Sequence, residues 1–150
     1  MAYLDWLNTQ LSGRLSAGAV GRVVFIRAHL ALSADHGLLV PVAAGGLELA
    51  ERWVKSPMRR VYAQGGVKPG FVSLLAEFEQ GQTALISAEA APAAEASALL
   101  LVTGQRGSLR FDDYPEPDAL VDMAGDMGRR WTNGITGALA SGKQFSRPPG

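Results

Sequence analysis

The chain contains two histidines, His29 and His36, and any proton transfer through an imidazole must use one of them. His29 alternates with Phe25 and Arg27 along an apolar run, which predicts one strand face that carries an aromatic ring, a cation and an imidazole. Such a face could bind a sugar or an anion. It could equally make polar contacts between subunits, and this second interpretation is favoured because one mixed strand face is a thin basis for a ligand site.

Other kinds of active site lack their characteristic residues. The chain has no cysteine, so it has no disulfide, thiolate ligand or cysteine nucleophile, and two distant histidines predict no metal site. Asp112 and Asp113 are adjacent and must point in different directions, which favours a solvated turn over a glycosidase pair. Neither a G-x-S-x-G elbow, a G-x-G-x-x-G fingerprint nor a P-loop occurs. We therefore expect no bound nucleotide cofactor.

The elements that position these side chains predict an α+β fold, a mainly antiparallel open sheet with helices packed on one face. Leu7, Leu11 and Leu15 recur at helical spacing and predict a first helix that ends near Gly18. Strands are expected at residues 22–32, 59–64, 71–78, 83–88, 98–103 and 108–111. In the first strand, Val24, Ile26, Ala28, Leu30 and Leu32 are expected on one face, and Val23, Phe25, Arg27, His29 and Ala31 on the other.

Two further helices are expected, at residues 45–55 and along a stretch from Leu120 to Leu139. Trp53 and Trp131 lie in these helices, and we expect both in the core.

The amino-acid composition limits the class of protein to which the chain can belong. The chain has 150 residues, 47% hydrophobic and 19% charged, which predicts one domain spanning residues 1–150. Fourteen basic residues balance 14 acidic ones, so we expect no nucleic-acid partner and no membrane partner. The first residues show no basic segment followed by an apolar block, which indicates a cytoplasmic protein without a signal peptide.

The sequence resembles one protein family in several segments, which occur in the same order along both sequences. Residues 37–57, GLLVPVAAGGLELAERWVKSP, resemble the signature helix of the glucose–fructose oxidoreductase/inositol dehydrogenase (Gfo/Idh/MocA) family, in the half that follows its dinucleotide-binding domain. Residues 15–29, LSAGAVGRVVFIRAH, are similar to the turn and first strand of that half. The hairpin FVSLLAEFEQGQTALISAE, the paired strands LLLVTGQRGSLRF and the closing helix ITGALASGKQF resemble further pieces. The resemblance covers nearly the whole chain.

The resemblance implies an inherited scaffold without its catalytic groups. Counting back from Pro57, Gly45 falls where the family has its catalytic histidine and Pro41 where it has its first acid. Glu48 falls at the late acid, where it would line a cleft; alternatively it is an exposed helix residue paired with Arg52 at i+4, and the two remain equal. His36 precedes this helix, where a substrate approaches in the family, but a solvated loop histidine is the favoured interpretation.

Several large apolar residues are expected on strand faces that the few helices cannot all cover: Phe25, Leu75, Leu85, Leu99 and Leu101. The family uses the open side of its sheet for subunit contacts. The resemblance therefore implies a homodimer.

Three hypotheses follow. The first is a free-standing, non-catalytic C-terminal-like domain without a Rossmann domain, which serves as an oligomerisation or small-ligand-binding module. The second is a substrate or oligomerisation subunit of a sugar or polyol NAD(P)-dependent dehydrogenase whose Rossmann domain is encoded separately. The third is a ligand-binding domain with Arg27 and His29 in its pocket, for a sugar or polyol.

Overall fold

The computed structural model describes residues 3–32, 38–66, 68–90, 96–115 and 128–146, and the side chain of Leu4 is not described. The helices are α1 (Tyr3–Ser16), α2 (Leu39–Val54) and α4 (Arg129–Ser141). The strands are β1 (Val23–Leu32), β2 (Met58–Gly66), β3 (Phe71–Phe78), β4 (Thr83–Ala90), β5 (Ser97–Gly104) and β6 (Gly107–Asp113). The predicted helix from Leu120 extends into residues 116–127, which lie outside the described part, and its described portion is α4.

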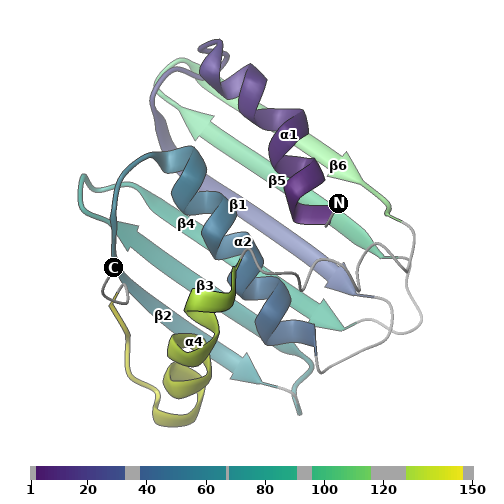
Figure 1. Ribbon diagram of the computed structural model, residues 1–150, viewed down its shortest axis with the longest axis vertical. Helices are drawn as coiled ribbons and strands as arrows, with labels where there is room; N and C mark the ends of the chain where they lie inside the picture. The colour runs from purple at the N-terminus through teal and green to yellow at the C-terminus, as the bar shows by residue number, and fades with distance from the viewer. Residues whose placement is uncertain (1–2, 33–37, 67, 91–95, 116–127, 147–150) are drawn as a thin grey trace.

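The six strands form one sheet in the order β2-β3-β4-β1-β5-β6 (Figure 1). Among the described strands only β1 and β4 pair in parallel, and the other neighbours are antiparallel. Short connections join β2 to β3, β3 to β4 and β5 to β6, and Gly81 supplies the positive φ, 89°, that the predicted β3–β4 hairpin needs. The predicted mainly antiparallel open sheet is confirmed.

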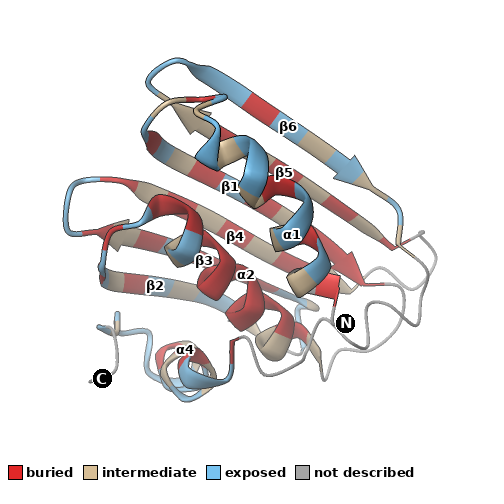
Figure 2. Ribbon diagram, turned by 45° about the horizontal axis from the view of Figure 1, so that its top comes forward, coloured by how far each residue is buried: buried red, intermediate tan, exposed pale blue. Residues whose placement is uncertain are grey.

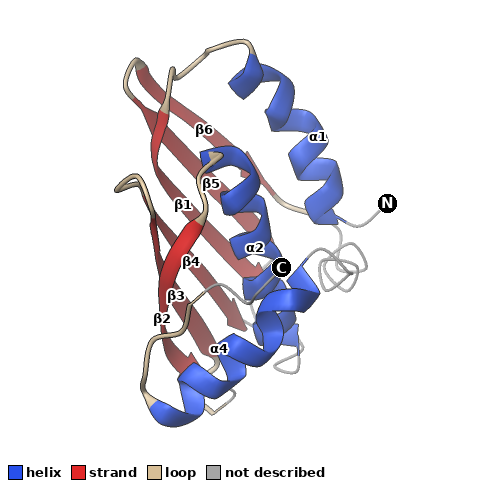
Figure 3. Cartoon of the chain, turned by 60° about the vertical axis from the view of Figure 1, so that its left-hand side comes forward, coloured by secondary structure: helices blue, strands red, loops and turns tan. Residues whose placement is uncertain are grey.

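All three described helices lie on one face of the sheet (Figure 3). α2 crosses β1, β3 and β4 and also contacts both other helices, while α4 lies over β2. Every second residue of the central strands is buried under this layer, as the alternating colours of Figure 2 show. The core therefore lies between the helices and one sheet face, and the predicted α+β class with helices on one side is confirmed.

Two predicted details of the elements are wrong. Helix α2 begins at Leu39 rather than residue 45, because Pro41 lies in its first turn, where a missing N–H breaks no helical hydrogen bond. In β1 a register shift falls between Val23 and Phe25, so Val23 is buried and Val24 is 39% exposed, the reverse of the predicted alternation. Beyond this bulge the predicted faces hold, although Ala31 is buried as well.

Candidate functional site

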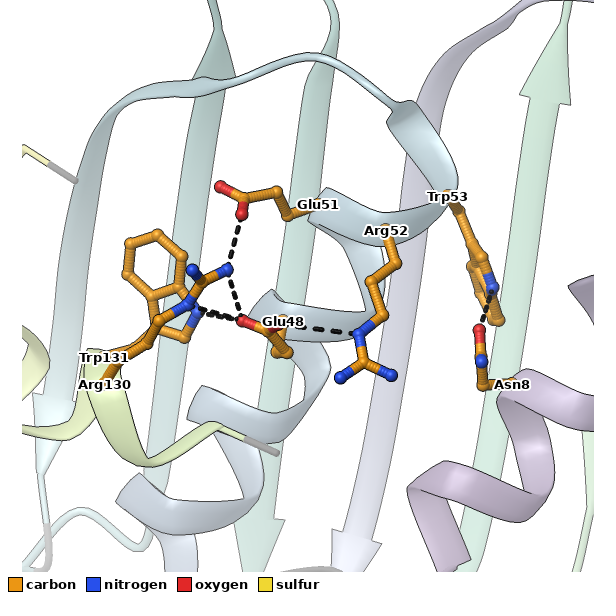
Figure 4. A network of polar contacts seen from close by, with 7 residues as sticks. All are labelled: Asn8, Glu48, Glu51, Arg52, Trp53, Arg130 and Trp131. Carbon is orange, nitrogen blue, oxygen red and sulfur yellow. Dashed lines mark hydrogen bonds and ion pairs between the residues drawn. The ribbon is translucent and has the colours of Figure 1, made fainter. Parts of the chain in front are cut away.

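The candidate residues lie in two separate regions. The first, which we call the Glu48 cluster, consists of Glu48, Glu51, Arg52, Arg130 and Trp131 between α2 and α4 (Figure 4). The second is the open face, the side of the sheet that the helices leave uncovered, where Arg27 and His29 lie. His36 lies outside the described residues.

Glu48 is a buried acid at the centre of a network of charge-assisted hydrogen bonds that includes two half-exposed arginines. Its Oε2 accepts hydrogen bonds from the indole Nε1 of Trp131 and the Nε of Arg130, each at 2.8 Å, and lies 2.7 Å from an Arg130 Nη2. Its Oε1 lies 3.5 Å from the Nε of Arg52, one helical turn along α2. Both carboxylate oxygens are therefore engaged, so this group is suited to hold two helices together rather than to carry a proton.

The arginine of this network also joins the two helices by a second contact. The Nη2 of Arg130 donates a hydrogen bond to Oε1 of Glu51 at 2.5 Å, and the guanidinium lies over the Trp131 ring, 4.8 Å from its centroid. Trp131 itself is fully buried, and its N–H reaches Glu48, as a buried indole requires.

The backbones of α2 and α4 also touch directly at the start of α4. A Cβ at Gly128 would lie 2.2 Å from the carbonyl carbon of Ala44 and 2.3 Å from the nitrogen of Gly45. Gly45 is buried in α2, at the position where the family resemblance places a catalytic histidine. Glycine at 128 is therefore a packing requirement, because any side chain there would collide with the backbone of α2.

From the sequence, Glu48 is expected either to line a cleft or to be an exposed helix residue paired with Arg52. The i+4 pair with Arg52 is present, but the expected exposure is wrong, because only 8% of Glu48 is exposed. Arg130 and Trp131 were missed as partners, since they are more than 80 positions away and no local pattern connects them. Trp53 and Trp131 are in the core, as predicted, and Trp53 donates to Oδ1 of Asn8 on α1 at 2.9 Å (Figure 4).

On the open face, Arg27 and His29 lie beside two leucines of β5. They line a shallow hollow of about 370 Å³ together with Leu99, Leu101 and Arg110. His29 Nε2 lies 3.3 Å from Oε1 of Glu89 on the neighbouring strand β4, and both side chains are partly exposed. The hollow thus combines two arginines with an apolar floor. Arg110 was missed, because only the cross-strand register brings it next to Leu101.

A second hollow, of about 510 Å³, lies on the same face over β2, β3 and β4. Its lining includes Tyr62, Leu75, Glu77 and Leu85. Glu77 accepts a hydrogen bond from Nε of Arg60 at 2.5 Å, and this bond is the main reason that the pKa of Arg60 is raised above its ordinary value. The open face therefore has one hollow over each half of the sheet, one over β2, β3 and β4 and the other over β1, β5 and β6.

Asp112 and Asp113 point to different sides of β6, as predicted, but the predicted solvated turn is wrong, because pairing with β5 extends the strand to Asp113. Asp112 pairs with Arg110, whereas Asp113 accepts a hydrogen bond from the hydroxyl of Tyr3 on α1. Burial, with a further contribution from this hydrogen bond, raises the pKa of Tyr3 above its ordinary value. In the described part of the chain, no three acids or histidines are grouped in a way that could hold a metal ion, and no helix is long and apolar enough to cross a membrane.

The structure thus keeps Glu48 apart from Arg27 and His29. Glu48 lies in the helical layer, and the other two lie on the opposite face of the sheet, so these residues do not form one active site.

These features define the chain as an open-faced α+β domain with three described helices on one side of a six-stranded sheet. Neither a protein-family model nor a curated protein matches the chain. Three solved structures with a similar fold are dehydrogenases. One is myo-inositol dehydrogenase from Lactobacillus casei in complex with NAD(H) and myo-inositol, with a TM-score of 0.73 and 9% identity over 95% of this chain and 59% of that one.

A myo-inositol dehydrogenase from Corynebacterium glutamicum has a TM-score of 0.71 and 11% identity, and the match covers 95% of this chain and 62% of that one. A probable dehydrogenase from Thermotoga maritima has a TM-score of 0.68 and 11% identity over 93% and 61% of the two chains. This chain therefore spans about three fifths of the length of these dehydrogenases. At such identities the likeness concerns the fold.

Proposed function

We propose that this chain is a C-terminal-like domain of the Gfo/Idh/MocA type whose role is to associate through its open face, without catalysis of its own. The observation that carries this proposal is the uncovered apolar surface of the sheet. Tyr62 on β2 is 38% exposed, and Phe71 and Leu75 are each 41% exposed on β3, whose other face is fully buried. Exposed apolar side chains gathered on one face are typical of protein interfaces.

The size of the open face supports a second copy of the chain as the partner. Six strands spaced about 4.8 Å apart, with about eight residues at roughly 3.4 Å each, give a face of roughly 800 Å². This is about the area that each partner contributes to a stable protein interface. A symmetric dimer would bury the same face on both copies, so that neither copy would keep an exposed apolar face.

The residues at the family's catalytic positions do not support chemistry by this chain. Gly45 and Pro41 have no group that can take a proton, and both oxygens of Glu48 are held by Trp131, Arg130 and Arg52. These residues do not fit the proton transfer that a nicotinamide-dependent oxidation of an alcohol requires, so we derive no step that uses such a cofactor.

Leu75→Arg tests the association, because it places a charge in the middle of the open face. Sedimentation velocity at micromolar concentration should give a dimer for the wild type and a monomer for Leu75→Arg. Thr136→Arg is the matched control, since Thr136 is exposed on α4, away from the open face, and this variant should remain a dimer. A wild-type chain that sediments as a monomer would falsify the proposal.

A second candidate function is that of a subunit in a sugar or polyol dehydrogenase whose Rossmann domain is a separate chain. It is favoured by the structural match, because this chain aligns with about three fifths of the length of each dehydrogenase compared. One of those dehydrogenases was solved in complex with NAD(H) and myo-inositol. Calorimetric titration of the isolated chain with NAD(H) should show no binding under either proposal, and tight binding would contradict both. Co-purification of a Rossmann-only protein from the native source would favour the second.

A further inference from the structure

A third hollow, of about 280 Å³, lies where α2 ends, beside the start of β1 and the β3–β4 hairpin (Figure 1). Its polar lining consists of Arg22, Lys55, Gln80 and Gln82, and Trp53 supplies an aromatic wall. On α2, Trp53 lies about 12 Å along the helix from Gly45, where the family resemblance places a catalytic histidine. The hollow is therefore separate from that position, and it shares no lining residue with the two hollows of the open face.

The hollow has two cations, and no acid is among the residues that line it. The Nη2 of Arg22 donates a hydrogen bond to the neutral Oε1 of Gln80 at 2.8 Å, and no carboxylate in the described part of the chain pairs with Arg22 or Lys55. Lys55 ends α2 with a φ of 57°, a left-handed conformation in which glycine is the usual residue, so a lysine here is unusual. Two cations without a countercharge in one hollow favour an anionic ligand.

The wall of the hollow also contains a buried amide that lacks a hydrogen-bond partner. Gln82 is 3% exposed, and its Oε1 accepts no hydrogen bond from the described residues. A buried carbonyl oxygen without a donor destabilises a fold, and a ligand that supplies the donor removes this cost. The hollow also lies at the end of α2, and the last carbonyl groups of a helix lack donors within it. These acceptors favour a ligand that carries hydroxyl groups beside its anionic group.

We propose that this hollow binds a small hydroxylated organic anion, a carboxylate or phosphate ester with hydroxyl groups on a short carbon chain. Arg22 and Lys55 bind the anionic group, and the amide of Gln82 accepts a hydrogen bond from a hydroxyl group. The carbon chain packs against Trp53. The volume lies just below the range of about 300–1,000 Å³ that is usual for ligand pockets, which suits a small ligand. This site does not depend on the proposed self-association, because it lies away from the open face.

Nuclear magnetic resonance titration tests the binding, with glycerol 3-phosphate and glycerate as the two probes. Glycerol lacks the anionic group, and propionate and inorganic phosphate lack the hydroxyl groups, so these three are the matched controls. At least one probe should bind with a dissociation constant of about 1 mM or less, and every control should bind several-fold more weakly. The indole signal of Trp53, assigned with Trp53→Phe, should shift, whereas that of Trp131 should not, because Trp131 does not line the hollow.

Removal of the two cations tests their role. Arg22→Gln combined with Lys55→Gln should weaken the binding of the probe at least about tenfold, since the negative end of the α2 dipole then faces the anion without compensation. Both side chains are exposed, so this variant should fold, which unchanged far-ultraviolet circular dichroism would verify. Lys68→Gln is the matched control, because Lys68 is an exposed lysine in the β2–β3 turn that does not line the hollow. This variant should keep the wild-type affinity.

Gln82→Leu separates a role in binding from a role in the fold. Because Oε1 of Gln82 has no donor among the described residues, this variant should not unfold at a lower temperature than the wild type. It should nevertheless bind the hydroxylated probe no better than the control without hydroxyl groups. A preference for hydroxyl groups that survives in Gln82→Leu overturns the inference. So does a loss of affinity in Lys68→Gln as large as that of the double variant, or the absence of a Trp53 shift with both probes.

Discussion

The Glu48 cluster and the open face contain the same kinds of groups, arginines paired with carboxylates, in opposite surroundings. At Glu48 the carboxylate itself is buried, and it engages two half-exposed arginines and a buried indole. On the open face both members of each pair are partly or largely exposed, as in Arg110 with Asp112 and His29 with Glu89. Burial makes the first set part of the fold, whereas the second set remains available to a partner.

The largest expected effect follows from removal of the buried acid. Glu48→Ala leaves the buried Trp131 N–H without an acceptor and leaves Arg130 with Glu51 as its remaining partner, and we expect a loss of about 3–5 kcal/mol in the free energy of unfolding. Asp112→Ala, which breaks only an exposed pair, should cost at most about 1 kcal/mol. Urea unfolding followed by tryptophan fluorescence measures both, and equal losses would remove the distinction between the two regions.

Two neighbouring leucines compare the two faces of the same strand. Leu74 is fully buried under the helices, so Leu74→Ala should destabilise the fold by about 2–5 kcal/mol. Leu75 points to the open face, and Leu75→Ala should change the unfolding free energy of the monomer by about 0.5 kcal/mol or less. The same urea titration, at a concentration where the chain is monomeric, provides the measurement. A large loss at Leu75 would indicate that the open face is covered within the monomer.

Two glycines of the α4 region give a matched pair within the helical layer. Gly128→Ala forces a Cβ against the backbone of Ala44 and Gly45, and we expect a loss of about 1–3 kcal/mol. A Cβ at Gly137 meets nothing within 4 Å, so Gly137→Ala should stabilise α4 by up to about 1 kcal/mol. Thermal unfolding should move in opposite directions for the two variants, and a neutral Gly128→Ala would contradict the direct helix contact.

A smaller loss than at Glu48, Leu74 or Gly128 is expected at Tyr3, whose hydroxyl donates to Asp113. Folding raises the pKa of this tyrosine above its ordinary value of 10.0, so its contribution to stability is complete below pH 10 and is lost as the pH rises further. Tyr3→Phe should cost about 1–2 kcal/mol at neutral pH. Above pH 10 the stability of the wild type should fall more steeply than that of the variant. Parallel curves would show that Tyr3 does not titrate with unfolding.

Much of the fold could be predicted from the sequence because its signals are local. The alternation along β3 and the glycine turn before β4 placed that hairpin correctly, and the spacing of Leu7, Leu11 and Leu15 predicted α1. The start of α2 could not be predicted in the same way, because Pro41 is compatible both with a loop and with a first helical turn. The bulge at Val23 depends on the pairing with β5, which is not encoded next to it.

The candidate site was less predictable, for the same reason. The i+4 spacing of Glu48 and Arg52 made one contact visible, but Arg130, Trp131 and Gly128 come from a distant segment. On the open face, Arg27 and His29 could be placed by alternation, while Arg110 joined them through the register of two further strand pairs.

The sequence by itself determined the class of the fold, the two faces of most strands and the absence of cysteine and of a nucleotide-binding loop, since each depends on residue type or on short spacing. The tertiary structure decided which face the helices cover and which charges lose contact with water. Glu48 became a buried hydrogen-bond acceptor because α4 packs on α2, and Arg27 remained exposed because no described helix lies over its face of the sheet. Chain segments far apart in sequence make that difference, and they meet only when the core forms.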